Sequence, residues 1–450
     1  MGSLTASLRR LGRRGSSGIV ALAVVATVAS LSARSTLARA PEPLHASLRS
    51  SEPAAGAVLR RSPIRIRLVF SEPIEASMSG LTFLASPRDV RPLVATADPH
   101  DVHALVAWPG VLPPGRYAMG WHAVSADGHR VNGRLDFTVL PDKGQPPAGV
   151  SSSVGRDSAL AATTASDTLA KSRFAADSRA DRLTRMLRGA AVTALLALAG
   201  LALLIAMLPL SGPRPMRVGT WLGVTATLLL AGYMVAWSIS VAGDGVAGVD
   251  AVMTATATTP GALEVARVAL AMLALWALGL ARRPGLAAAF AGIATLITGA
   301  SGHPATLSPA WTIPAKAIHL GAAALWLGGL IWLVTADRHG GRYVEGARRI
   351  SSLALGAVLA VVATGILQGA LFLPSVGSLF QSTYGRVLLL KSAGFVVLVF
   401  FGAYHRRIVP RMETTVARRQ LRRSVRAEIA VMVVVSILGG LLATIAPPHR

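Results

Sequence analysis

The sequence predicts a two-part fold: an N-terminal all-β, immunoglobulin-like sandwich, followed by an all-α polytopic membrane bundle of about eight helices. Three observations support this prediction. Residues 45–140 contain short runs with period-two alternation, whereas apolar runs of membrane-spanning length begin near residue 190. Of the 450 residues, 52% are hydrophobic and only 15% are charged, a composition too apolar for an ordinary soluble protein.

Residues 1–40 have the pattern of an export signal. Arginines at positions 9, 10, 13 and 14 precede an apolar run over residues 19–33, as in the charged and apolar regions of a signal peptide. The run is short for a membrane span, so we interpret residues 1–40 as a signal peptide, with an uncleaved N-terminal anchor as the alternative. In both cases the next domain is expected outside the cytoplasm.

Residues 41–140 form the predicted exported domain. Alternation is clearest at residues 64–70, and further short runs at 81–84, 104–108, 117–122 and 135–139 are separated by Pro, Gly and Asp turns. About seven short strands in roughly 95 residues are typical of a small immunoglobulin-like sandwich.

Five motifs in this domain resemble, in order, those of the CopC family of periplasmic copper-binding proteins. They are HASL at 45–48, SEPAAG at 51–56, FSEPI at 70–74, LPPGRY at 112–117 and WHAVSADGH at 121–129. The resemblance implies that Cu(II) is held by Asp127, by His129 and by His45, the last through its ring and, as an N-terminal residue, its amine. Independently, imidazole and carboxylate ligands suit Cu(II), and Gly128 permits a tight turn. Without the resemblance, a polar hairpin is the preferred interpretation of this turn.

The role of His45 depends on where the export signal is cleaved. The preceding residues 42–44 do not match a signal-peptidase site, and after an earlier cleavage His45 offers only its imidazole. A nearby acidic and histidine cluster could then supply a further ligand: Asp98, His100, Asp101 and His103. We prefer the interpretation of that cluster as a solvated turn between two strands.

Residues 141–185 are rich in Ser, Ala, Gly and Asp and predict a flexible linker. Residues 186–450 form the predicted transmembrane domain. Its apolar segments of suitable length lie at about 189–210, 218–241, 262–281, 285–300, 313–335, 353–373, 387–405 and 428–446, the fourth being the shortest. Glu264 and Arg267, one turn apart at the start of the third segment, predict an ion pair.

The charge pattern predicts the partner and the orientation of the bundle. The net charge is +24, and the arginines cluster at the ends of apolar segments rather than on one amphipathic face. We therefore expect a lipid bilayer as partner and no nucleic acid. The positive-inside rule places the loops around residues 214–217, 282–283, 338–349 and 406–426 in the cytoplasm. This predicts a multi-pass protein of the inner (plasma) membrane, with its N-terminal domain on the periplasmic or extracellular side.

The bundle resembles the CopD copper-resistance membrane family. The matching residues are Gly302-His303, the stretch HLGAAALWLGGL at 319–330, Tyr384-Gly385-Arg386 with Lys391, and Arg426-Ala427-Glu428. The resemblance implies copper movement across the inner membrane, usually described as uptake. Because ionisable groups inside a bilayer are costly and are functional candidates, we predict that His303 and His319 bind copper where it enters the bundle.

Together these patterns predict a protein of copper homeostasis, in which the exported domain captures Cu(II) and the bundle transports copper inward. The sequence leaves open whether Cu(I) or Cu(II) crosses the membrane, and whether other periplasmic copper carriers take part. One alternative is copper sequestration, resistance or sensing without transport. A second, ranked lower, is a haem-binding electron-transfer protein, which would need paired axial histidines. The sequence has no Cys, no phosphate-binding loop and no recognisable catalytic set, so we expect no thiolate site and no enzyme activity.

Overall fold

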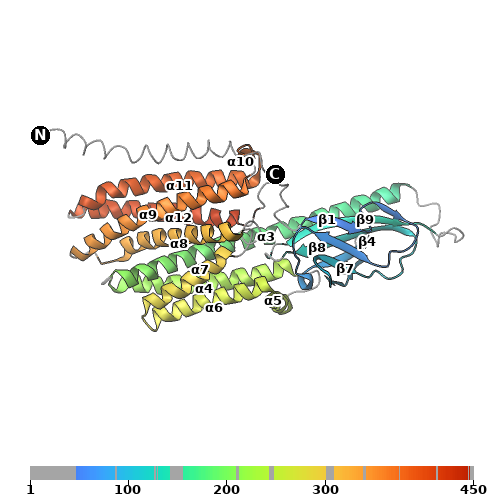
Figure 1. Cartoon of the computed structure of the whole chain (residues 1–450), viewed down its shortest axis with the longest axis horizontal. Helices are drawn as coiled ribbons and strands as arrows, with labels where there is room; N and C mark the ends of the chain where they lie inside the picture. Colours follow the sequence, from blue (N-terminus) through green and yellow to red (C-terminus); the bar gives the residue numbers. More distant parts are fainter. Residues whose placement is uncertain are drawn as a thin grey trace.

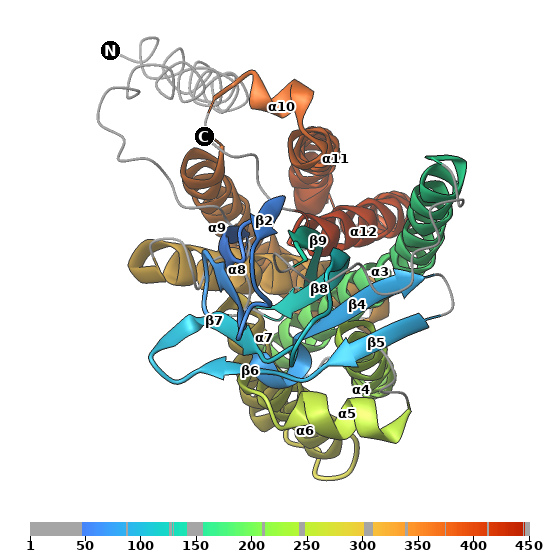
Figure 2. The ribbon, with the colours of Figure 1, turned by 90° about the vertical axis from the view of Figure 1, so that its right-hand side faces the viewer.

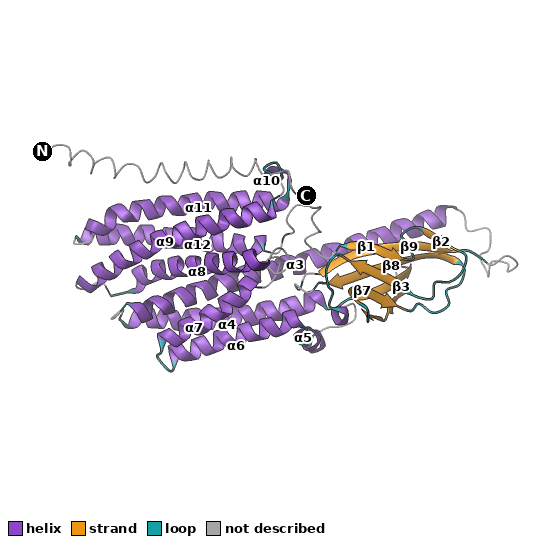
Figure 3. Ribbon diagram, viewed as in Figure 1, coloured by secondary structure: helices purple, strands orange, loops and turns teal. Residues whose placement is uncertain are grey.

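The structure is a computed structural model that describes residues 47–86, 89–125, 128, 130–141, 156–208, 212–242, 248–300, 309–337, 341–373, 375–411, 414–443 and 445. It consists of a β-sandwich and a helical bundle that lie end to end (Figures 1 and 3). The predicted two-part fold is therefore confirmed.

The sandwich is built from two sheets with strand orders β1-β3-β7-β6 and β2-β9-β8-β4-β5. The strands are β1 (Leu48–Glu52), β2 (Ala57–Leu59), β3 (Ile66–Phe70), β4 (Gly80–Ser86), β5 (Asp89–Leu93), β6 (Ala95–Asp98), β7 (Asp101–Ala107), β8 (Gly115–Val124) and β9 (Arg130–Val139). The pairings are antiparallel, except that β2 runs parallel to β9. Strands β8 and β9 pair along their whole length and form a long antiparallel hairpin.

Alternate residues of the central strands form the core of the sandwich. Ile66, Leu68 and Phe70 of β3 are buried on the inner face, while the residues between them are half-buried. They belong to one apolar cluster with Met119 and Leu135 of the second sheet. This inner face explains the period-two alternation in the sequence, because successive side chains of a strand point to opposite sides of the sheet.

In the bundle, seven helices are long and apolar enough to cross a membrane, and α7 is a shorter apolar helix. They are α3 (Arg156–Met207, apolar from Arg182), α4 (Pro213–Val241), α6 (Thr259–Gly279), α7 (Pro284–Ala300), α8 (Pro309–Thr335), α9 (Gly341–Phe372), α11 (Thr383–Ile408) and α12 (Thr415–Leu442). Short elements connect them: α5 (Val249–Thr256), α10 (Ser378–Gln381) and the 3-10 turn η3 (Val409–Arg411). Each helix matches one predicted segment, and α7 is the predicted short one.

Helix α3 differs from the prediction, because the second part of the expected linker is helical. Residues 156–185 continue without a break into the first membrane helix. This stretch is rich in Ala and contains neither Gly nor Pro before Gly189, so nothing in the sequence ends the helix. The helix runs beside the sandwich, in contact with β4, and then packs against α4, α7, α8 and α12 in the bundle (Figure 1).

Helices α3 and α8 cross at very short distance through two glycines. A Cβ atom at Gly200 would collide with the carbonyl group of Ala324, and one at Gly328 would collide with the backbone of Gly200. Small residues at such a crossing allow two membrane helices to pack backbone against backbone. The crossing fixes α8, the helix that carries His319, against the centre of the bundle.

The helices alternate in direction, so the bundle has two distinct ends. Helices α4, α7, α9 and α12 finish at the end that carries the sandwich, and α6, α8 and α11 begin there (Figure 1). We call this the sandwich end and the opposite one the far end. Viewed along the long axis, the strands lie over the sandwich end of the helices (Figure 2).

Candidate functional site

Four of the predicted copper ligands lie outside the described residues: His45, Asp127, His129 and His303. His319 is described. In this part of the chain the structure describes Ser125, Gly128 and Arg130, which locate the turn from β8 to β9.

The turn is described at Ser125, Gly128 and Arg130. The N–H of Gly128 donates to the carbonyl oxygen of Ser125 at 2.8 Å, which closes the turn. Gly128 has φ of +85°, a conformation that glycine adopts without a steric penalty. The tight turn predicted at Gly128 is confirmed.

The same turn is bound to the sandwich end of α4. The indole Nε1 of Trp237 donates to the carbonyl oxygen of Gly128 at 3.0 Å. Nη1 of Arg130 donates to the carbonyl oxygens of Ser240 and Ala242, both at 3.2 Å. These carbonyls lie at the C-terminal end of α4, where they lack helical partners and the helix dipole is negative, so a guanidinium group is a favourable partner.

An apolar cluster surrounds these polar contacts. Met78 and Val124 of the sandwich are buried together with Tyr233, Trp237 and Val241 of α4. The indole approaches the turn so closely that a Cβ atom at position 128 would lie 3.3 Å from its Cζ2. Glycine at 128 is thus required for both its backbone conformation and the close approach of α4.

The first strand begins at this end of the sandwich as well. Ser47 donates its N–H to Oγ of Ser71 at 2.9 Å, and shortly afterwards Ile74 forms an isolated β-bridge with Ser125. Ser47, Ser71 and Ser125 therefore lie at the end of the sandwich that faces the bundle.

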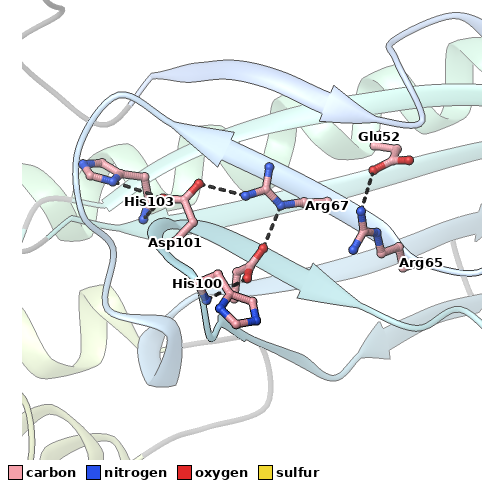
Figure 4. A network of polar contacts seen from close by, with 7 residues as sticks. Glu52, Arg65, Arg67, His100, Asp101 and His103 are labelled. Atoms are coloured by element: carbon pink, nitrogen blue, oxygen red, sulfur yellow. Dashed lines mark hydrogen bonds and ion pairs between the residues drawn. The ribbon is translucent and has the colours of Figure 1, made fainter.

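The second cluster considered as a ligand source is engaged in ion pairs (Figure 4). Arg67 binds Asp98 Oδ2 through Nε and Asp101 Oδ2 through Nη2, each at 2.8 Å. The Arg67 guanidinium holds the pKa of Asp98 below its usual range, and the backbone N–H of His103 does the same for Asp101. No group of three or more His, Cys, Asp or Glu able to hold a metal occurs among the described residues. These contacts support the preferred interpretation of a solvated turn.

His319 is held by the neighbouring helix α9. Its Nδ1 lies 2.9 Å from Oγ1 of Thr364, and that hydroxyl donates in turn to the carbonyl oxygen of Ala360 at 2.6 Å. Because the hydroxyl proton is already donated, the hydroxyl accepts a hydrogen bond from Nδ1–H, and this assigns the tautomer. Nε2 then keeps its lone pair, as in metal-binding histidines whose other nitrogen is bound by the protein.

A second polar centre lies toward the far end and was not predicted as a site. Glu428 of α12 is 1% exposed, and its Oε1 accepts from the indole Nε1 of Trp326 at 2.9 Å. Nδ1 of His405 lies 2.9 Å from Glu428 Oε2, and Nε2 lies 2.7 Å from Oγ of Ser424. The signal available in the sequence was the acidic residue at the start of an apolar segment, since such residues are expensive in a membrane.

Comparison with known proteins gives two family matches in this chain. The family described as "CopC domain" matches residues 48–140, and the family described as "Copper resistance protein D" matches residues 345–442. The copper transport protein CutJ of Bacillus subtilis (strain 168) is 27% identical over 420 residues, which cover 88% of this chain and 74% of that protein.

Two further similarities concern the sandwich alone. Copper resistance protein C of Escherichia coli is 37% identical over 105 residues, covering 21% of this chain and 81% of that protein. The crystal structure of CopC from Methylosinus trichosporium OB3b is 26% identical in sequence and covers 23% of this chain and 100% of its own, with a TM-score of 0.21.

Proposed function

We propose that this chain, which belongs to the CopC family through residues 48–140 and carries a CopD domain at residues 345–442, captures copper on its sandwich and passes it into its membrane bundle. The observation that carries the proposal is the binding of the β8–β9 turn to α4 through Trp237 and Arg130. The turn expected to hold copper is thereby anchored at the sandwich end of the bundle. Transfer then needs no diffusion of a separate carrier.

For the copper site itself we propose Asp127 and His129, with His45 as a further ligand. One carboxylate and two imidazoles form a donor set that suits Cu(II), the strongest binder among the divalent first-row metals. Two observations support this set: Gly128 closes the turn between two of the ligands, and Ser47 places the start of β1 at the same end of the sandwich.

We propose that the sandwich lies on the periplasmic or extracellular side of the inner membrane. The far end carries dense positive charge, for example at Arg282 and Arg283 after α6 and at Arg406 and Arg407 in the last turn of α11. By contrast, the described residues 249–256 and 375–382 at the sandwich end contain no Lys or Arg. Cytoplasmic loops of membrane proteins carry the excess of Lys and Arg, which supports a cytoplasmic far end.

Inside the bundle we propose that copper moves inward past two polar centres. His319 lies about 15 Å from the start of α8, in the sandwich half, whereas His405 lies about 33 Å from the start of α11, near the far end. The first centre offers a free imidazole nitrogen and the second an imidazole beside a carboxylate, Glu428. His303 remains a proposed ligand where copper enters.

The alternatives predict different arrangements or different results. A haem held by two histidines would need one histidine on each face of the ring at nearly the same depth in the bundle, but the described membrane histidines, His319 and His405, lie about 18 Å apart along the helix axes. Sequestration or sensing would use the sandwich site without any copper crossing the bundle. That alternative is separated from transport by experiment.

The test compares binding and accumulation in the full chain. In Asp127→Ala/His129→Ala we expect loss of the Cu(II) signal in electron paramagnetic resonance of the purified protein, together with lower cellular copper. In His319→Ala we expect the Cu(II) signal to persist while accumulation falls. His100→Ala, in the ion-paired cluster, is the matched control and should change neither.

Two results would contradict the proposal. An unchanged Cu(II) signal in the double variant would exclude this turn as the copper site. Normal accumulation in His319→Ala at equal expression, together with normal Cu(II) binding, would favour sequestration over passage through the bundle.

A further inference from the structure

Arginines inside the bundle and arginines on its surface differ in how their charge is balanced. Arg267 of α6 is buried, and its Nη1 contacts the two carboxylate oxygens of Glu264 at 2.7 and 2.6 Å, which confirms the predicted ion pair. Near the start of α12, by contrast, Arg419, Arg423 and Arg426 are exposed. No described residue forms a hydrogen bond or an ion pair with these three side chains. Their guanidinium groups are accessible to a ligand from outside the bundle.

The three arginines form one stripe along α12. They follow one another at intervals of four and three residues, which places them on the same face of the helix. The opposite face, with Leu421 and Val425, is buried in the core of the bundle. We call Arg419, Arg423 and Arg426 the arginine stripe. Because it lies opposite the buried face, the stripe faces whatever surrounds the bundle.

The neighbouring described residues do not balance the charge of the arginine stripe. Residues 405–411 and 414–427, which the structure describes at the end of α11 and the start of α12, contain no Asp or Glu. Two carboxylates of the far end already have partners: Glu345 pairs with Arg349 at 2.6 Å, and Glu428 lies 2.9 Å from His405. Like charges three or four residues apart on a helix destabilise it. An anion bound between neighbouring arginines would remove this repulsion.

The same face of α12 becomes apolar toward the sandwich end. Ala430 and Val434 continue the spacing of the arginine stripe and are exposed, Val434 at 57%. A ligand that covers the whole face therefore needs an anionic group at one end and apolar chains at the other. An anionic phospholipid has both, whereas an acidic protein segment matches the stripe alone.

The arginine stripe also lies close to the depth of lipid headgroups. Counted from Ile429, where the apolar part of α12 begins, Arg426 is about 4.5 Å and Arg423 about 9 Å further toward the far end. The headgroup layer on each side of a bilayer is about 5–8 Å thick. Side chains three residues apart on a helix are neighbours, with Cβ atoms about 5–6 Å apart. A phosphate group in this layer is therefore within reach of both long side chains.

We propose that Arg423 and Arg426 hold the phosphate of one anionic phospholipid, such as phosphatidylglycerol, whose acyl chains lie along Ala430 and Val434. Arginine suits this role, because its planar fork of N–H groups binds phosphate oxygens by charge-assisted hydrogen bonds. A zwitterionic lipid binds more weakly, since the arginines repel its ammonium group. The site requires only that the bundle spans a membrane, and it does not depend on the copper role proposed above.

The experiment counts lipids bound to the purified full chain by native mass spectrometry, in non-ionic detergent and copper-free buffer. Dioleoyl-phosphatidylglycerol and dioleoyl-phosphatidylcholine are titrated separately, so that only the headgroup differs. We expect the first phosphatidylglycerol to bind at a lower half-saturating concentration than phosphatidylcholine. In Arg423→Gln/Arg426→Gln the half-saturating concentration of phosphatidylglycerol should rise at least about tenfold, because hydrogen bonds to two charged groups are lost. Binding of phosphatidylcholine should change less.

Arg348→Gln/Arg349→Gln is the matched control, because it removes the same charge from the far end but on α9, where Arg349 has Glu345 as its partner. It should bind phosphatidylglycerol as the unmodified chain does. Equal weakening in the two double variants would show that only the overall charge of the far end is read, and would overturn the site. Equal affinity of the unmodified chain for the two lipids would overturn it as well.

Soluble polyglutamate tests the other occupant, an acidic protein segment. We expect it to leave phosphatidylglycerol bound at constant ionic strength, since it has no chains to place along the apolar part of the face. Displacement of phosphatidylglycerol by polyglutamate would reassign the arginine stripe to an acidic protein partner and refute the lipid site.

Discussion

Replacing Trp237 with phenylalanine tests whether the sandwich is fixed to the bundle through the β8–β9 turn. The change keeps an aromatic ring in the apolar cluster but removes the indole N–H that binds the carbonyl oxygen of Gly128 at 3.0 Å. Gly128 is buried, so its carbonyl loses its donor without gaining free access to water. Such a loss costs about 1–3 kcal/mol.

This cost falls on the docked arrangement alone, because a separated sandwich exposes the same carbonyl to solvent. We therefore expect the separated population to rise about 5- to 150-fold. Amide hydrogen exchange of the full chain in detergent measures that population when opening is fast. Peptides covering residues 74–80 and 236–242 report on the two sides of the contact and should exchange faster by the same factor.

Trp221→Phe is the matched control, since Trp221 lies on the same helix but is 71% exposed. Its exchange should equal that of the unmodified chain. Equal protection in Trp237→Phe and Trp221→Phe would refute the reasoning, because it would mean that the indole bond contributes nothing to docking.

Three further changes probe other parts of the chain. Gly328→Ala forces α3 and α8 apart and should lower the thermal midpoint by several degrees, whereas Gly356→Ala, with open space around it, should not; equal midpoints would contradict the close crossing. The Arg67 guanidinium lowers the pKa of Asp98 in the folded state. The stabilisation by the Asp98 carboxylate is therefore complete above its unfolded-state pKa and is lost as the pH falls through the lower folded-state pKa. In Asp98→Asn the free energy of unfolding should therefore fall less between about pH 5 and 2 than in the unmodified chain, as measured by denaturant unfolding at each pH. An equal fall in both chains would contradict a stabilising role of the ionised Asp98. Glu428→Gln keeps an acceptor for the indole but removes the charge beside its histidine; we expect lower copper accumulation, and unchanged accumulation at equal expression would exclude a role for this centre.

The strands found from the sequence and the strands missed differ in their place in the sheets. The five apolar runs named from alternation correspond to β3, β4, β7, β8 and β9, which are the strands with a neighbour on each side. The remaining strands, β1, β2, β5 and β6, are the four sheet edges. The burial patterns of β1 and β6 explain why the sequence did not reveal these strands. Both consist of half-buried and exposed residues, with no fully buried position. Edge strands lack the buried face that produces a period-two signal.

The membrane helices were predictable because each must bury about twenty apolar residues in lipid, whatever its neighbours are. The contacts that make the site were not. Trp237 and Gly128 are separated by 109 residues, and an aromatic residue near a helix end is equally expected at a membrane interface. The turn at Gly128 was predicted from glycine's conformational freedom, but its second role, admitting the indole, depends on a partner that periodicity does not reveal.

The long helix α3 has a mechanical consequence. Strand β9 leaves the bundle and covers about 34 Å, and residues 156–182 of α3 return over about 39 Å before the helix enters the bundle. Helix α3 therefore lies beside the sandwich with its first part and inside the bundle with its second part, where it packs against α4, α7, α8 and α12. A tilt of about 10° in the part of α3 inside the bundle would move the N-terminal end of the helix by about 7 Å. A rearrangement of the bundle would thus be transmitted to the sandwich at two contacts, that of the β8–β9 turn with α4 and that of α3 with β4.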